Sequence, residues 1–237
     1  MTGGGVEYVS YEDKGNLYKI TVAFEGRDIS MFITKDAKYF VQRAIPIEVP
    51  KSDKPKVELF IWSYCPSGVQ AQGILADVVS LLEKNVDFEA ALYYGGHGEY
   101  EIQQNKIQAC IQEIAKDKYW EYASDFVKNI YPKCGSSRDI KCDKTESIKL
   151  MKSLGIDYSK VMSCVKDRGE DLLSEYSSRA KEYGVTGSPT LIINGVKANT
   201  ARTAEAFKNA VCEAFNTPPS ECSTSLNSSA ASSSGNC

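Results

Sequence analysis

The stretch FIWSYCPSG, residues 60–68, decides how the rest of the chain is interpreted. It closes a short apolar run, KVELFIW, of the kind that forms a buried strand, and opens PSGVQAQGILADVVSLLEKN, in which apolar residues recur at helical spacing. Cys65 therefore falls at a junction between a strand and a helix, and Pro66 suits the first helical turn, where a missing N–H costs nothing. Because the strand-like run VDFEAALYY follows, residues 56–94 predict a β-α-β unit with a crossover helix.

The remaining strands of the same sheet are expected near residue 190. The run TLIINGVKA turns at Asn194-Gly195, which is a strong hairpin signal, and TAEAFKNAVCEAF follows as a last helix that Thr203 can cap. Residues 99–184 contain few strand signals and several amphipathic helical pieces. We therefore predict an α/β fold, in which helices cover a small sheet and a helical subdomain is inserted midway.

The two ends of the chain differ from this pattern. Residues 1–50 contain NLYKITVAF and DISMFIT, which are rich in β-branched and aromatic residues, with the turn EGRD between them, so we predict an antiparallel β-hairpin or meander. The polar segment PKSDKP, residues 50–55, is expected to be a linker. An exposed edge strand in the extension could pair with a second copy to give a homodimer. In residues 216–237 we expect a cysteine-anchored start and then a disordered, serine-rich tail.

Composition excludes several classes of function. The chain has 237 residues and a formal net charge of -3, with charges of both signs mixed, so neither nucleic acid nor an anionic membrane surface is an expected partner. It contains no run of eighteen apolar residues, hence no predicted membrane span. The start, MTGGG, has no basic and apolar signal-peptide pattern, although trimming could have removed a leader or an anchor.

Cysteine usage suggests structural disulfides in an oxidising, extracytoplasmic compartment (periplasm or cell surface), with the cytoplasm still open, because eight cysteines are many for a reducing environment. No CxxC pair occurs and His97 is the single histidine, so no metal site is expected. Cys237 is expected to be the end of a trimmed chain or a free thiol prone to dimerise. The candidates for structural bridges lie in three neighbouring or cross-helix pairs: Cys110 with Cys164, Cys134 with Cys142, and Cys212 with Cys222. Six cysteines allow fifteen pairings, and some could instead be free buried thiols.

Three features together resemble one superfamily. They are the cysteine in FIWSYCPSG, the Pro189 that precedes a strand and hairpin in VTGSPTLIINGVKA, and the helical insert between them. This arrangement is similar to the thioredoxin fold, and the insert resembles the DsbA-like branch, with a CPxG variant of the usual motif. The resemblance covers residues 56–215, and it implies a thioredoxin-like core in residues 56–98 and 185–215 around an insert at 99–184.

The resemblance implies a place for a protein substrate. In that family the proline matching Pro189 is cis and faces the active-site sulfur, and the backbone around Ser188 would pair with an extended client. Pro66 and Ser67, next to the cysteine, are candidate substrate-binding residues. The family's redox pair is CxxC, whereas Gly68 stands here in place of the second cysteine. The family activity therefore carries over to Cys65 alone.

The expected chemistry is thiol-disulfide exchange with Cys65 as the nucleophile. Unpaired N–H groups and the helix dipole at a helix N-terminus stabilise a thiolate, and such thiols have pKa values of about 3.5–7.5 instead of about 8.5. The thiolate attacks a disulfide to form a mixed disulfide. A one-thiol site then needs a small-molecule thiol, a separate redox partner or a second protein cysteine to release its client. No organic cofactor or metal is implied.

Two other classes of function fit the same residues. A redox-inactive thioredoxin-fold binding or chaperone-like module would be favoured by a Cys65 that is unreactive and buried, or bridged to another cysteine. A glutathione-linked enzyme would be favoured by a basic pocket near Cys65, and the sequence offers no nearby cluster of lysine or arginine. His97, in GGHGE, is either a proton donor near Cys65 or an ordinary polar residue of an exposed turn.

Overall fold

The computed structural model describes residues 5–41, 48–229 and 237, and the chain divides into two compact units, Met1–Pro46 and Ile47–Cys237. The first unit is an antiparallel meander with its strands in the order β1-β2-β3-β4. Its strands are β1 (Glu7–Asp13), β2 (Leu17–Phe24), β3 (Arg27–Thr34) and β4 (Phe40–Val41). Glu25 and Gly26 link β2 to β3 with positive φ angles of 51° and 74°, the tight-turn conformation that glycine adopts most easily. The predicted antiparallel extension is confirmed; its predicted continuation over residues 42–47 lies outside the described residues.

The second unit is built on a sheet with the strand order β6-β5-β7-β8. Its strands are β5 (Lys56–Ile61), β6 (Asp87–Leu92), β7 (Thr190–Ile193) and β8 (Val196–Lys197). β5 pairs with β6 in parallel and with β7 antiparallel, so it lies in the middle, and its side chains from Val57 to Ile61 are fully buried. The β7–β8 hairpin turns at Asn194-Gly195, both with positive φ, as the sequence predicted. The predicted α/β, thioredoxin-like fold is confirmed.

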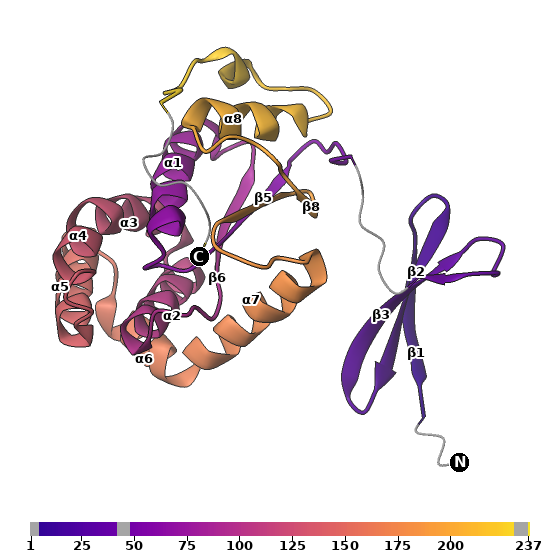
Figure 1. Cartoon of the computed structure of the whole chain (residues 1–237), viewed down its shortest axis with the longest axis horizontal. Coiled ribbons are helices and arrows are strands. Elements are labelled where there is room, and N and C mark those ends of the chain that lie inside the picture. Colours follow the sequence, from indigo (N-terminus) through magenta and orange to yellow (C-terminus); the bar gives the residue numbers. More distant parts are fainter. Residues whose placement is uncertain (1–4, 42–47, 230–236) are drawn as a thin grey trace. The chain divides into compact units, whose positions relative to one another are not determined.

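Two helices of the core pack against each other beside this sheet (Figure 1). α1 (Pro66–Leu82) makes the crossover from β5 to β6 and buries the apolar positions that predicted it, among them Val69, Leu75 and Val79. α8 (Ala204–Glu213) contacts α1, and the Thr203 hydroxyl caps it by accepting the N–H of Ala206 at 3.0 Å. A 3₁₀ turn, η3 (Ser220–Ser223), follows α8 and contacts both helices.

The insert between β6 and β7 is helical throughout. It comprises α2 (Glu99–Ile114), η1 (Lys116–Lys118), α3 (Tyr119–Asp125), η2 (Phe126–Ile130), α4 (Tyr131–Cys134), α5 (Ile140–Ser153), α6 (Tyr158–Asp167) and α7 (Gly169–Tyr183). The sequence predicted one amphipathic piece where α3, the π-helical η2 and α4 occur, because the buried positions Tyr119, Tyr122 and Phe126 follow helical spacing. In the described residues no helix is both long and apolar enough to cross a bilayer.

The expected linker at 50–55 is tied to the second unit. Ser52 pairs with the segment after α8: its N–H donates to the Ala214 carbonyl at 2.9 Å, and its carbonyl accepts the Asn216 N–H at 2.9 Å. These backbone bonds satisfy polar groups that a free linker would leave to water. The segment therefore anchors β5 to the end of α8.

Candidate functional site

Cys65 sits at the start of α1, where the backbone leaves β5 and turns. It is the N-cap residue of the helix, with extended backbone angles, and Pro66 is the first helical residue. The Gly68 N–H points at the Cys65 Sγ, with N and S 3.4 Å apart. The first turn of α1 contains no acidic residue. A sulfur anion at this position would thus meet a backbone N–H and the positive end of the helix dipole, with no carboxylate in that turn.

The Ser188–Pro189 segment reaches the same place from more than a hundred residues away. The peptide bond between the two residues is cis, and the Ser188 carbonyl oxygen lies 3.3 Å from the Cys65 Sγ. The Ser188 hydroxyl accepts the Trp62 N–H at 2.9 Å, which joins this segment to the loop that carries Cys65. The structure thereby brings together the residues for which the sequence predicted a shared role, and Ser67, the second residue of α1, is buried beside them.

Cys65 is bridged to Cys237 across a sequence separation of 172 residues, with Cα atoms 6.0 Å apart. The expectation that Cys237 could be a free thiol is therefore wrong. The Cys237 N–H also donates to the Ser188 carbonyl at 3.0 Å. Figure 1 shows the C-terminal end of the described chain beside the start of α1. A tail composed mainly of serine and alanine carries no local pattern that indicates such a contact. The sequence offered one signal for this bridge, which was the number of cysteines. Once three pairs are formed among the eight cysteines, Cys65 and Cys237 remain.

The other six cysteines form three bridges, Cys110–Cys164, Cys134–Cys142 and Cys212–Cys222. The first joins α2 to α6 within the insert, the second closes the loop before α5, and the third fixes η3 to the end of α8. None of the three includes Cys65 or Cys237. They hold the scaffold on which the site is built.

Glu101 is a residue of this site that the sequence did not reveal. Its side chain is fully buried, and its carboxylate accepts the Tyr64 N–H at 3.0 Å and the His97 N–H at 3.1 Å. The His97 Nδ1 lies 2.9 Å from the same carboxylate, and the His97 ring meets the edge of the Trp62 ring. The helical pattern predicts polar residues on the solvent side, so a buried glutamate gives no signal of its own. His97 is thus linked through Glu101 to the backbone next to Cys65.

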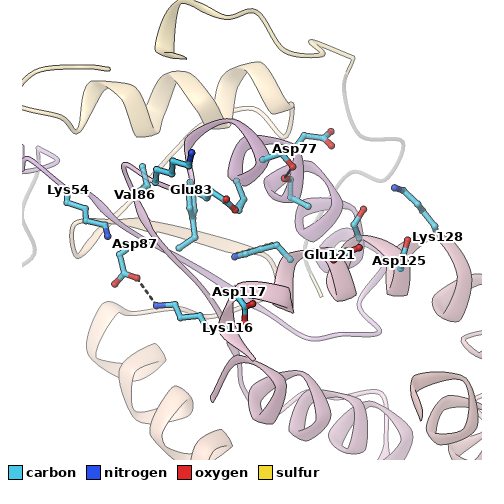
Figure 2. Close-up of a pocket in the computed structure, with 17 residues that line it drawn as sticks. Lys54, Asp77, Glu83, Val86, Asp87, Lys116, Asp117, Glu121, Asp125 and Lys128 are labelled. Carbon is cyan, nitrogen blue, oxygen red and sulfur yellow. Dashed lines mark hydrogen bonds and ion pairs between the residues drawn. The ribbon is translucent and has the colours of Figure 1, made fainter. Parts of the chain in front are cut away.

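A hollow of about 730 Å³, shown in Figure 2, lies between α1, the start of β6 and α3. Neither Cys65 nor Ser188 lines it. Its wall carries charges of both signs, and two of them, Lys116 and Asp87, are already paired at 2.8 Å. Across the described ranges, no three His, Cys, Asp or Glu side chains gather as a metal site would require. We assign no ligand to this hollow.

Comparisons with known proteins agree with this fold. The sequence profile of the thioredoxin family matches residues 54–213. Among solved structures, the chain is similar to the MdbA protein, a thiol-disulfide oxidoreductase from Actinomyces oris, with a TM-score of 0.56, 13% identity, and coverage of 70% of this chain and 83% of that one. It is also similar to DsbA from Pseudomonas aeruginosa, with a TM-score of 0.44, 17% identity, and coverage of 65% and 77%. At 13% identity the likeness to the Actinomyces oris structure shows the fold alone.

The curated relatives of this chain include four vacuolar-sorting receptors, three from Arabidopsis thaliana and one from Pisum sativum. The chain is 30% identical to Vacuolar-sorting receptor 5 of Arabidopsis thaliana over 143 residues, which is 54% of this chain and 22% of the receptor. The chain thus spans about a fifth of the length of that relative. The receptor shares a segment with this chain, and the greater part of the receptor lies outside the match.

Proposed function

This chain belongs to the thioredoxin family, and we propose that it exchanges thiols and disulfides with protein clients through Cys65. The observation that carries the proposal is the position of the Cys65 sulfur at the N-terminus of α1. Cys65 caps α1, receives the Gly68 N–H, and lies 3.3 Å from the carbonyl before a cis proline. Few positions in a fold favour a thiolate in this way and also present backbone groups to a client.

The reaction is an in-line displacement at sulfur. The Cys65 thiolate attacks one sulfur of a client disulfide, a bond forms between Cys65 Sγ and that sulfur, and the other client sulfur leaves as a thiolate that takes a proton from water. The Ser188 carbonyl is available beside the new bond and can accept an N–H from an extended client. Pro189 shapes the same groove, and Pro66 and Ser67 border it. His97 stays a candidate proton donor, acting through its link to Glu101.

The proposed partners are protein thiols and disulfides, together with a thiol or dithiol that resets the site. The proposed compartment is extracytoplasmic, because four disulfide bonds persist in oxidising surroundings and are rare in the cytosol. A homodimer through the N-terminal sheet is part of the same proposal. Its β1 strand is exposed along its whole length, which leaves an edge available for pairing.

A second candidate function is a redox-inactive binding module. Two observations favour it: Cys65 is already bridged to Cys237, and the chain is similar to a segment of a protein named as a vacuolar-sorting receptor. A module of this kind would use the fold to hold a peptide and would need no free thiol. The two functions differ in whether the Cys65–Cys237 bridge opens under mild reduction.

The alkylation rate of Cys65 against pH separates the two functions. The folded protein is reduced mildly, alkylated over a range of pH, and mapped by mass spectrometry, with the Cys237→Ser variant measured in parallel so that Cys65 is also followed alone. For an exchange site we expect a midpoint within about 3.5–7.5, below the value of about 8.5 for an ordinary thiol. A bridge that withstands mild reduction, or a Cys65 midpoint no lower than that of an ordinary thiol, would contradict the proposal and favour the binding module.

A further inference from the structure

The backbone of Cys237 occupies the position that the proposed function gives to a client. Its sulfur is bonded to Cys65 Sγ, and its N–H donates to the Ser188 carbonyl at 3.0 Å, beside the cis bond to Pro189. In the proposed function, a client would form a disulfide with Cys65 and could donate an N–H to the same carbonyl. The bridge therefore joins two residues at the reacting position, whereas the three other bridges join elements of the scaffold.

A second sulfur cannot come from α1 itself. A Cβ atom at Gly68 would lie 2.5 Å from the Ser188 Oγ and 2.9 Å from the Trp62 carbonyl oxygen, closer than atoms can approach. The Ser188 Oγ is held there because it accepts the Trp62 N–H. The space that a cysteine side chain would need at position 68 is thus filled by the segment that presents the cis proline. A resolving sulfur must come from elsewhere in the chain or from another molecule.

The chain before Cys237 is held close to the site. Cys222 is bridged to Cys212 on α8, the Lys208 Nζ donates to the Thr224 carbonyl at 2.6 Å, and the Leu226 N–H donates to Glu205. The Glu205 N–H in turn donates to the Asn227 carbonyl at 3.2 Å. Cys237 lies ten positions further along the chain than residue 227, so the two are at most about 33–36 Å apart. A tether this short keeps an attached group at an effective concentration of the order of millimolar.

We propose that Cys237 supplies the second sulfur of the redox pair. This sulfur comes from the C-terminal end of the same chain and not from helix α1. The inference rests on the proposed function of Cys65. After Cys65 has formed a mixed disulfide with a client, the Cys237 thiolate attacks the Cys65 sulfur, forms the Cys65–Cys237 bond and expels the client as a thiolate, which takes up a proton. The dithiol loses two electrons and the client disulfide gains them. An external dithiol, by the same displacement, returns the pair to the reduced state.

A single-turnover reaction tests this step. The client is a peptide whose one cysteine is joined in a disulfide to an aromatic nitrothiol, which is a good leaving group because its thiol pKa is low. Reduced protein is freed of small thiols and mixed with one equivalent of the peptide. Attack by Cys65 is read as the chromophore that is released, and attack by Cys237 as free peptide seen by mass spectrometry. Wild type is compared with Cys237→Ser, a nearly isosteric change, and with Cys65→Ser.

We expect both wild type and Cys237→Ser to release the chromophore faster than Cys65→Ser, because both keep the attacking thiol. Wild type should then free the peptide and form the Cys65–Cys237 bond, while Cys237→Ser should keep the peptide on Cys65 at least about tenfold longer until a small-molecule thiol is added, because attack by an intramolecular thiol is lost. If Cys237→Ser frees the peptide as fast as wild type, the inference is wrong although the proposed function stands. If neither protein releases the chromophore faster than Cys65→Ser, the proposed function itself fails.

Discussion

Gly68 explains, at the scale of one residue, why the usual two-cysteine helix is absent. The missing β-carbon leaves room for the Ser188 Oγ, which would otherwise lie 2.5 Å from it. That hydroxyl satisfies the Trp62 N–H, which would be costly to leave without a partner in the interior. A cysteine at position 68 and a serine at position 188 therefore exclude each other. The site keeps the serine and, by our inference, takes its second sulfur from the tail.

This exclusion gives a stability prediction. We expect Gly68→Ala to lower the free energy of unfolding by about 1–3 kcal/mol, because the added methyl group overpacks the site. Gly73→Ala, on the same helix, is the matched control: its Cβ would meet only Val127 at 3.4 Å, an ordinary contact. The control should gain up to about 1 kcal/mol from helix propensity. Urea unfolding with the disulfides intact measures both variants, and equal effects at the two positions would contradict the steric argument.

At the scale of elements, the insert grips the loop that carries Cys65. The Tyr64 side chain is buried, and its hydroxyl donates to the Asp143 Oδ1 at 2.7 Å, so α5 is attached to the residue next to the nucleophile. The Cys134–Cys142 bridge fixes the chain immediately before Asp143. Burial raises the pKa of Asp143 from 3.8 to about 6, although Tyr64 and Gln103 donate to it and lower that pKa in part. The insert thus holds the site by the hydrogen bond from Tyr64 to Asp143, and the pKa of that acceptor is about 6.

The raised pKa makes stability depend on pH in a stated direction. The folded protein binds a proton at Asp143 more tightly than the unfolded chain does, so the contribution of Asp143 to the free energy of unfolding falls as pH rises from 3.8 to about 6. Over that window we expect wild type to lose about 3 kcal/mol relative to Asp143→Asn, which has no carboxyl group to titrate. Urea unfolding of both proteins across the window gives the difference. Two curves that stay parallel would contradict this assignment.

The elements were predictable where the pattern was local. The β-branched and aromatic residues of β2 and β3, the helical period of α1 and the Asn194-Gly195 turn all lie within short windows, so propensity and spacing were enough. The site was predictable at Cys65, Ser188 and Pro189 through resemblance. The roles of Glu101 and Asp143 could not be predicted, because the sequence does not distinguish a buried carboxylate from an exposed one. Cys237 was missed for the complementary reason, since a contact across 172 residues leaves no local trace.

At the scale of the whole chain, the two units differ in how much they bury. The second has a continuous core around β5, whereas Val22 is the one buried hydrophobic residue among the described residues of the first. Large side chains of that unit are exposed: Tyr8, Tyr11, Ile29, Tyr39 and Phe40. A sheet that buries so little apolar surface is not expected to be stable in water without a covering surface. An exposed edge and exposed rings together favour a second copy as that cover.

We therefore expect the protein to associate through its first unit. Light scattering over a range of concentrations should show the mass of a dimer, measured in the Cys65→Ser/Cys237→Ser double variant so that no intermolecular disulfide contributes. Removal of residues 1–46 should leave a monomer that keeps the helical and sheet content of the second unit. Tyr8→Lys/Tyr11→Lys, on exposed β1, is the subtler test and should weaken the dimer, because buried charge in the new interface costs free energy. A full-length chain that stays monomeric at every concentration would exclude self-association.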